Sequence, residues 1–382
     1  MYYVLIGFVL VISTLNILLG NSYGRNVAKN KRIELYCFVF CVLYLSCLAA
    51  FRYETGRDWQ EYIRIFSLST EVNNGLGYES GFIVLNKLFK LVFDDFYLMQ
   101  VCIIFFSSFF IYRNFYRYSL LPILTLLLYV SRYYFQTDMA QTRQHIAMGI
   151  LAYGMMFVHR KQFLKWVMVV ILASLFHITA ITAFPLYFTT RVVLRKKICW
   201  ILLLIYIIIF IFGLTFVRGL LNVAVQIPFI PLRIKTIGLN YLSSPVFGQQ
   251  SQFNSGLGFL ANTCFIFYIV FIYSRKGCKK KAFYMANFFV GLFFVAMGRN
   301  LDQFARIANY YMICGCGLCG YNLIIGNKQL FRNCEFIRIT FFLLFIFFEL
   351  YNFFSMWFSY SPLIHSSYHL DYTPWKSFLF NR

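Results

Sequence analysis

Residues 198–217, ICWILLLIYIIIFIFGLTFV, form an unbroken apolar run about as long as a helix that crosses a bilayer. Lys196 and Lys197 precede the run, and Arg218 follows it. The run lacks the alternation of polar and apolar residues that strands lining a barrel lumen would show. It therefore predicts a transmembrane helix, and similar runs recur along the chain.

The composition of the 382 residues agrees with many such helices. Hydrophobic residues make up 60% of the chain and charged residues 13%, with a mean hydropathy of +0.67. These values exclude a soluble domain with an ordinary polar surface. The predicted fold class is all-α, a polytopic integral membrane protein.

The formal net charge of +22 comes from basic residues in short clusters between apolar runs. Such clusters are typical of orientation signals, so we expect no nucleic-acid partner. The eleven cysteines fall in predicted helices or basic loops, which argues against a disulfide framework. Cys314, Cys316 and Cys319 would point in different directions on a helix, so no metal site is predicted there.

Twelve apolar runs are candidate helices, some shorter than a full span. They are residues 2–20, 33–51, 96–112, 119–131, 143–158, 164–177, 178–190, 198–217, 258–274, 282–298, 307–325 and 336–352. By the positive-inside rule the basic linkers between them are cytosolic, which places both termini outside. Residues 164–190 are too long for one helix, and the alternation of charge favours two short helices that meet at His177.

The chain is predicted to be a single transmembrane domain, 1–382, with two long outer loops. Residues 52–95 would hold a charged motif followed by an interfacial or re-entrant helix. The expected apolar face of that helix is Phe82, Leu85, Phe89 and Val92. Residues 218–257, with several prolines and a polar run, predict a large irregular loop.

Arginine and lysine are distributed differently between the two sides of the membrane. In this topology the cytosolic linkers hold ten arginines and eleven lysines, whereas the outer regions hold ten arginines but four lysines. Orientation alone would deplete both residue types outside. We therefore expect the outer arginines to bind phosphate or carboxylate through their bidentate fork.

Residues 51–62, FRYETGRDWQEY, place two arginines and three acids where an apolar run leaves the membrane. Ionisable groups near hydrocarbon are costly, so their clustering indicates a functional site. On a helix, Arg57 and Glu61 would form an ion pair. The alternative is an interfacial anchor whose charges pair among themselves and whose aromatic residues lie at the membrane surface.

Three further polar clusters lie at predicted outer helix ends. They are Arg132, Asp138, Gln141, Arg143, Gln144 and His145; then Phe176-His177; then Arg299, Asp302 and Arg306. Each has a structural alternative: an arginine reaching toward water, a hydrogen-bonded core histidine, and pairing among the three charges. We find no metal-ligand spacing and no nucleotide loop, so stabilisation of anionic charge would depend on arginines.

These residues resemble the motifs of the EpsG family of polysaccharide polymerases, which includes many Wzy-type O-antigen and capsule polymerases. The resemblance covers residues 45–320. The matching positions are Arg52-Tyr53 with Gly56 and Asp58, Glu79-Ser80-Gly81 with Leu85-Asn86, Arg143-Gln144 with Ala147, Phe176-His177 with Pro185, and Arg306 with Tyr310.

The resemblance implies a glycosyltransferase of the bacterial cytoplasmic (inner) membrane, without cofactor or metal. It would join oligosaccharide repeat units carried on undecaprenyl pyrophosphate at the periplasmic or extracytoplasmic face. The implied acid–base groups are Asp58 or Glu79, with His177 as a reserve base. The implied pyrophosphate and sugar ligands are Arg52, Arg57, Arg143, Gln144, Arg299, Arg306, Tyr53 and Trp59. The expected partners are lipid-linked glycans, membrane lipids, a chain-length regulator and a flippase.

Two other functions would use similar groups. A lipid-linked oligosaccharide flippase or transporter should show related halves and cationic groups reachable from both sides, whereas no repeat is visible here. An O-antigen ligase would use the same pyrophosphate leaving group, and the sequence does not separate it from a polymerase.

Overall fold

The computed structural model describes residues 27–53, 58–71, 78–119, 121–190, 196–228, 235–236, 239, 282–298, 302–319 and 347. The regular structure among these residues is helical throughout. The chain divides into two compact units, residues 1–187 with 318–382 and residues 188–317. The predicted all-α fold is thus confirmed for the described part of the chain.

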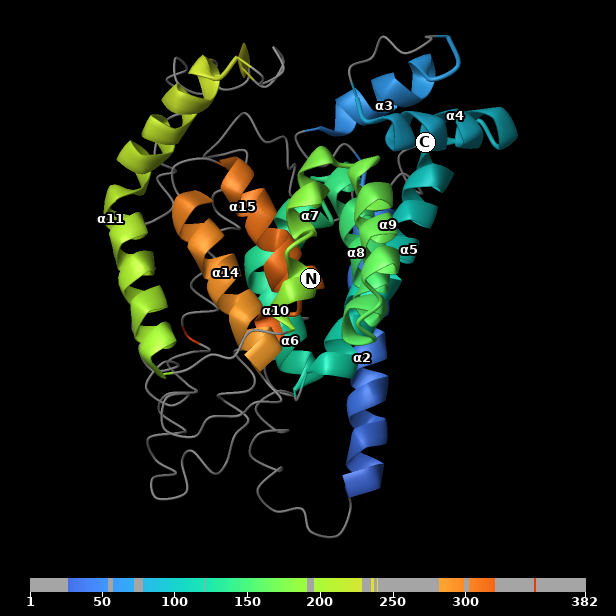
Figure 1. Ribbon diagram of the computed structural model, residues 1–382. Helices are drawn as coiled ribbons and strands as arrows, with labels where there is room; N and C mark the ends of the chain where they lie inside the picture. The colour runs from blue at the N-terminus through green and yellow to red at the C-terminus, as the bar shows by residue number, and fades with distance from the viewer. Residues whose placement is uncertain are drawn as a thin grey trace. The chain divides into compact units, whose positions relative to one another are not determined.

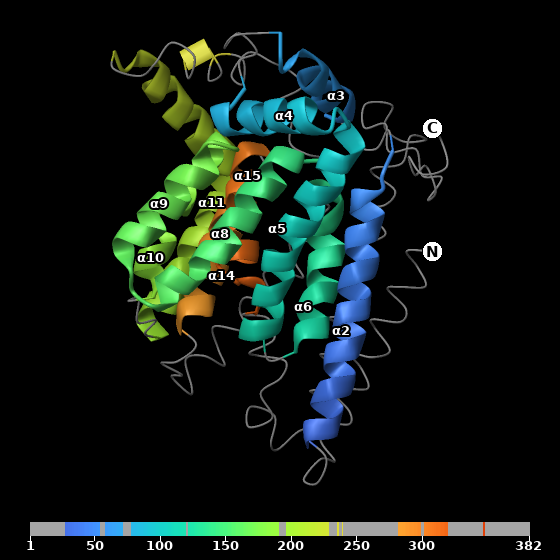
Figure 2. The same cartoon turned by 90° about the vertical axis from the view of Figure 1, so that its right-hand side faces the viewer.

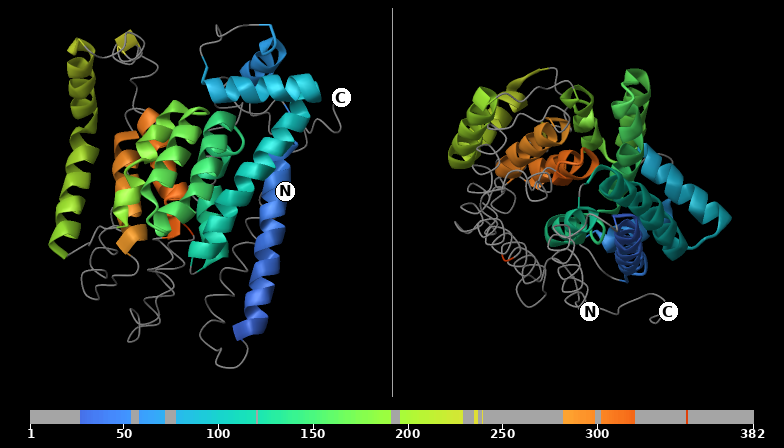
Figure 3. Two further views of the ribbon diagram at one scale, coloured as in Figure 1. Left: turned by 45° about the vertical axis from the view of Figure 1, so that its right-hand side comes forward. Right: turned by 90° about the horizontal axis from the view of Figure 1, so that it is seen from below.

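Along the described residues, the first unit is built from seven longer helices, the short helix α7 (Phe135–Thr137), a π-helical turn and a 3-10 turn (Figure 1). Its helices are α2 (Val27–Ala50), α3 (Trp59–Leu68), α4 (Ser80–Val92), α5 (Phe96–Tyr118), α6 (Pro122–Tyr129), α8 (Thr142–His159) and α9 (Phe163–Ser174). A π-helical turn η1 (Val130–Tyr134) and the short α7 (Phe135–Thr137) continue α6, and a 3-10 turn η2 (Ile178–Ala183) follows α9. Helices α3 and α4 lie across one end of α2 and α5 (Figures 2 and 3).

Helix α8 packs closely on its neighbours because two glycines face them. A Cβ atom on Gly149 would lie 2.6 Å from the Cα of Ser107 in α5. A Cβ on Gly154 would lie 2.4 Å from the Cγ1 of Val169 in α9. Small residues of this kind let helix backbones approach where hydrocarbon surrounds them. The middle and the second half of α8 are therefore packed tightly against α5 and α9.

Two local signals set the ends of α4 and α5. Asp94 has a φ of 47°, which turns the chain sharply after α4. The carboxylate of Asp95 then accepts hydrogen bonds from the backbone N–H groups of Tyr97 at 2.8 Å and Leu98 at 3.2 Å. This is an N-cap, and it fixes the first turn of α5.

The second unit contains α11 (Lys196–Gln226), α14 (Ala282–Gly298), α15 (Asp302–Asn309) and the π-helical turn η4 (Tyr310–Cys314). Helix α14 contacts both α11 and α15. The side-chain amide of Asn287 donates to the carbonyl of Gly315 at 2.8 Å, which ties the end of η4 to α14. Cys316 has a φ of 55°, so the three cysteines at 314–319 are separated by a turn rather than carried on one continuous helix as expected.

Among the described residues, one helix, α5, is both long and apolar enough to cross a bilayer, and shorter apolar helices accompany it. The count of twelve transmembrane helices stays a prediction, as does the single-domain organisation. The expected helices at 2–20 and 258–274 lie outside the described residues, as does that at 336–352 apart from residue 347. The predicted loop 218–257 begins inside α11, and most of its remainder also lies outside them.

Two predicted elements differ in detail. Helices α9 and η2 meet at His177 as expected, but the second is a 3-10 turn followed by the short α10 (Leu186–Thr189). Pro185, which has no N–H to continue a helix, lies between η2 and α10. Helix α4 forms as predicted, yet it buries Phe82 and Asn86 and leaves Val92 67% exposed.

Candidate functional site

Glu79 marks the start of α4, which is held against the end of α9. The backbone N–H of Gly81 donates to the carbonyl of Leu175 at 2.9 Å. A Cβ atom at residue 81 would lie 2.8 Å from that same oxygen, so a side chain there would push the two segments apart. The Glu79-Ser80-Gly81 motif is thereby placed beside the Phe176-His177 motif.

Arg143, the second residue of α8, forms an ion pair with Glu79. Its Nη1 lies 2.6 Å from Oε2 of Glu79, and the two side chains are 21% and 16% exposed. The guanidinium also lies over the ring of Tyr78, 4.9 Å from its centroid, and the hydroxyl of Tyr62 is another partner. Its Nε is buried and has no hydrogen-bond partner in the described part of the chain. Arg143 therefore keeps a donor that no described protein group uses.

His177 lies on the other side of the same carboxylate. Its Nδ1 is 3.8 Å from Oε1 of Glu79, and the backbone N–H of Ile178 donates to that oxygen at 3.3 Å. The hydroxyl of Thr179 is 3.4 Å from the same ring nitrogen. His177 is in the extended conformation between α9 and η2, which turns its side chain toward α4. Glu79 thus joins three chain segments that are far apart in the sequence.

Opposing effects act on the pKa of Glu79. Burial raises the pKa, but the positive charge of Arg143, together with hydrogen bonds, outweighs burial and holds it below its usual value. The carboxylate is therefore ionised at neutral pH. An ionised carboxylate beside a histidine and an arginine can accept a proton from a hydroxyl group while the arginine binds an anion.

A second ion pair on α3 borders this site. Glu61 lies 2.6 Å from Arg64, and the hydroxyl of Tyr78 donates to the same carboxylate. Hydrogen bonds from Arg64 and then Tyr78 lower the pKa of Glu61 to about 2. Arg57, the expected partner of Glu61, lies outside the described residues, so that pairing stays a prediction.

The other predicted residues of the first outer motif lie close to α3. Asp58 is the half-buried residue before α3, and its charge acts on Tyr62, the partner of Arg143. Trp59 is 6% exposed and packs edge-on against Tyr53, with 5.3 Å between ring centroids. Its indole N–H is buried and has no partner among the described residues. Sugar binding by Tyr53 and Trp59 stays a prediction, as does the role of Asp58.

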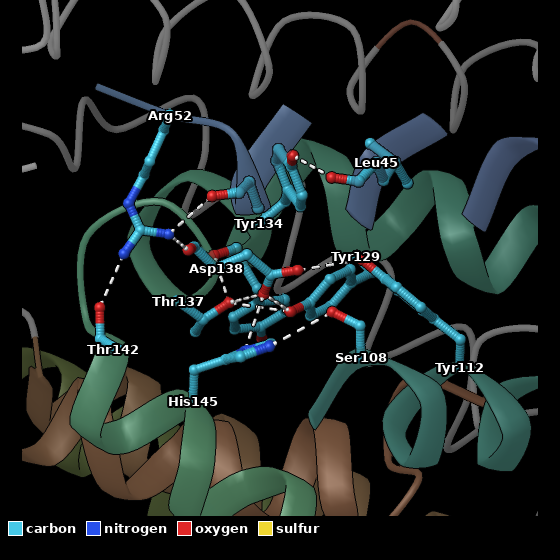
Figure 4. A network of polar contacts seen from close by, with 12 residues as sticks. Leu45, Arg52, Ser108, Tyr112, Tyr129, Tyr134, Thr137, Asp138, Thr142 and His145 are labelled. Atoms are coloured by element: carbon cyan, nitrogen blue, oxygen red, sulfur yellow. Dashed lines mark hydrogen bonds and ion pairs between the residues drawn. The ribbon is translucent and has the colours of Figure 1, made fainter. Parts of the chain in front are cut away.

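Arg52 is placed differently from the expected phosphate ligand. It is 3% exposed and donates to the backbone carbonyls of Ala49 and Asp138 and to the hydroxyl of Thr142 (Figure 4). In this arrangement its hydrogen bonds go to protein groups. Gln144, also predicted to bind substrate, is 1% exposed.

The remaining predicted ligands fall elsewhere. Arg306 is half-buried on α15 in the second unit, and the buried Tyr310 follows it about one helical turn later. Arg57 and Arg299 lie outside the described residues. Their roles stay predictions.

Sequence reasoning missed two tyrosines and a buried pair. Tyr62 and Tyr78 contact Arg143, but neither carries a spacing signal that points to this contact. Asp138 and His145, which belong to one polar cluster of the sequence, lie 3.1 Å apart and are both fully buried. Their spacing by about two helical turns could have suggested a shared face, but not their burial.

Comparison with known proteins connects these motifs to one family. The model of the EpsG family matches residues 35–365, a range that includes every residue of the Glu79 site. No curated protein and no solved structure matches the chain. This match and the apolar helices together indicate a membrane protein. Because the match covers most of the sequence, the chain belongs to the EpsG family.

Proposed function

We propose that this chain is a glycosyltransferase that polymerises lipid-linked oligosaccharide repeat units on the outer face of the bacterial cytoplasmic membrane. The observation that supports it most strongly is the meeting of Glu79, Arg143 and His177. They come from α4, α8 and the α9–η2 junction, and each belongs to a motif by which the sequence resembles the family. A group that can accept a proton thus lies in direct contact with a group that can bind an anion.

In the proposed reaction, a hydroxyl of the acceptor repeat unit attacks C1 of the reducing-end sugar of the donor glycan. The hydroxyl proton passes to Glu79 as the new C1–O bond forms. The bond between C1 and the oxygen of the undecaprenyl diphosphate breaks, and the electron pair leaves with the diphosphate. Arg143 stabilises the charge that develops on this leaving group.

The magnitude of this stabilisation is adequate for a site without a metal ion. One guanidinium about 4 Å from a phosphate contributes on the order of 4 kcal/mol at an effective dielectric constant near 20. Two or three arginines would therefore supply several powers of ten in rate. Arg57, Arg299 and Arg306 are the proposed additional ligands. Asp58 is the alternative base, and His177 orients Glu79 or replaces it.

The test is complementation of a deletion strain, with surface polysaccharide separated on a gel. The wild-type gene should restore a ladder of chain lengths, whereas Glu79→Ala, Arg143→Ala and Asp58→Ala should leave a single attached repeat unit. Membrane insertion is checked by immunoblotting of the membrane fraction. A normal ladder from Glu79→Ala or Arg143→Ala would contradict the assigned site.

The same gel separates the two alternative functions. Loss of a ligase or of a flippase would leave no repeat unit attached to the final acceptor, whereas loss of a polymerase leaves one. Deletion that removes all attached glycan would therefore contradict the proposed function. A chain-length regulator, a flippase and membrane lipids are the proposed partners, because polymerisation needs translocated substrate and a defined end point.

A further inference from the structure

The turn that precedes α8 decides where Arg143 points. Residues 138–141 connect α7 to α8, and α8 begins at Thr142, directly before Arg143. A small rotation of this turn would move the guanidinium away from Glu79, since the side chain projects from the first turn of the helix. The groups that fix residues 138–142 are therefore relevant to the site.

Arg52 bridges the two ends of this turn (Figure 4). Its Nη1 donates to the carbonyl of Asp138 at 2.7 Å, and its Nη2 donates to Oγ1 of Thr142 at 2.7 Å. The backbone of Arg52 is held in turn, because the side-chain amide of Gln100 donates to its carbonyl at 3.0 Å. The planar guanidinium can make both bonds at once, which a lysine ammonium on a flexible stem does less well.

The side chain of Asp138 is fixed as firmly as its backbone. Its carboxylate accepts hydrogen bonds from the hydroxyls of Tyr112 at 3.0 Å and Tyr129, and it lies 3.1 Å from Nδ1 of His145. These contacts join α5, α6 and α8 around a fully buried carboxylate. Hydrogen bonds within a buried polar network restrict the movement of the groups that they join.

This network could be mistaken for a hydrolytic triad. Ser108 lies 3.3 Å from Nε2 of His145, and His145 lies 3.1 Å from Asp138. All three side chains are at most 1% exposed, however, and Gly149 packs directly on the neighbouring Ser107. A substrate has no room beside the serine, so the arrangement is better explained as an anchor.

We infer that Arg52 is a positioning residue that holds the first turn of α8 and thereby aims Arg143 at the anion site. It acts through its bonds to Asp138 and Thr142 rather than by contact with substrate. The inference rests on the proposed function to the extent that Arg143 binds a diphosphate. It adds that the motif containing Arg52 holds the motif containing Arg143 in position.

The test measures binding of inorganic pyrophosphate to the full-length purified protein by calorimetry. Arg52→Lys keeps the charge but loses the fork, and Thr142→Val removes one acceptor without altering charge. Each should weaken binding on the order of tenfold, as loss of a supporting group around a bound ion does. Thr142→Ser, which keeps the hydroxyl, should restore it. Thr125→Val, a buried threonine of α6 outside the network, is the matched control.

A double-mutant cycle separates positioning from direct binding. If Arg52 acts only through Arg143, Arg52→Lys should cause no further loss in an Arg143→Lys background. Losses that multiply in the double variant would identify Arg52 as a ligand in its own right and overturn the inference. Unchanged binding in Thr142→Val would overturn it as well.

Hydrogen exchange provides a readout that does not require a ligand. The backbone N–H of His145 donates to the carbonyl of Gln141 at 2.9 Å and should exchange faster in Thr142→Val than in the control. A wild type that binds no pyrophosphate would contradict the proposed function. Unchanged exchange in Thr142→Val would instead contradict the positioning role, so the two failures are distinguishable.

Discussion

The guanidinium of Arg143 lies 2.6 Å from the carboxylate of Glu79, although 64 residues separate them in the sequence. Without substrate, the arginine is thus neutralised by an internal anion. A diphosphate that binds Arg143 must compete with this carboxylate, and its arrival would release Glu79 to accept a proton. The ion pair therefore connects the binding of the donor to the readiness of the base.

This competition predicts opposite effects of Glu79→Gln on binding and on polymerisation. The affinity for inorganic pyrophosphate should rise roughly tenfold, the change that about 1.4 kcal/mol of removed competition gives. The ladder of chain lengths should nevertheless disappear, because the amide cannot accept the proton. Calorimetry and the polysaccharide gel measure the two effects.

Glu61→Gln is the matched control for that variant. Glu61 forms an ion pair of the same length with Arg64, but on the exposed side of α3. Its replacement should leave both pyrophosphate affinity and the ladder nearly unchanged. Weaker binding in Glu79→Gln than in the wild type would refute the competition.

The pair also predicts how stability depends on pH. The pKa of Glu79 is lower in the folded protein than in the unfolded chain, where it is about 4.3. The pair therefore stabilises the fold at pH values above the unfolded pKa, and this contribution is lost as the pH falls through the folded value. Thermal unfolding in detergent should show wild type more stable than Glu79→Gln at pH 7. The difference should shrink below about pH 4; a difference that grows on acidification would show that the sign is wrong.

Gly81→Ala should separate α4 from the end of α9. The added methyl group would lie 2.8 Å from the backbone oxygen of Leu175, which has little freedom to move. We expect a loss of about 1–3 kcal/mol in unfolding free energy, the usual cost of overpacking, and shorter polysaccharide chains because Glu79 moves with the helix. Thermal unfolding and the gel measure these changes.

Gly219 on α11 provides the control for this substitution. A Cβ atom there meets no other atom within 4 Å, so Gly219→Ala should be neutral or slightly stabilising through helix propensity. Equal effects of the two substitutions would indicate that the contact between Gly81 and Leu175 does not hold α4 in place.

Apolar length predicted where many helices lie, but not where they end. The expected helix at 96–112 stopped before Arg113, whereas α5 continues to Tyr118. Charged residues in the last turn do not end a helix, since their long side chains can reach water while the backbone stays helical. The break at His177 was predictable because charge alternation required two crossings in a segment too short for two full helices.

The site was predictable as separate pieces but not as one assembly. Glu79, Arg143 and His177 were each chosen from charge, position or resemblance, yet no local spacing indicates that one carboxylate joins all three. For Arg52, charge and sequence position did not predict the contacts that its side chain makes. Its charge and its place near the membrane surface suggested a phosphate ligand, whereas partners 86 and 90 residues away enclose it.

A final prediction concerns the face of α4 that points away from the first unit. Val84, Leu88 and Leu91 form an exposed apolar row on this helix, and Lys87 lies on its flank. An amphipathic helix with such a row lies in the membrane interface with the apolar side toward the acyl chains. A spin label at Leu88→Cys should therefore be more accessible to dissolved oxygen than to a polar nickel chelate. A label at Lys87→Cys should show a smaller preference for oxygen. If both labels favour the chelate, α4 faces water, and the acceptor glycan rather than lipid covers this row.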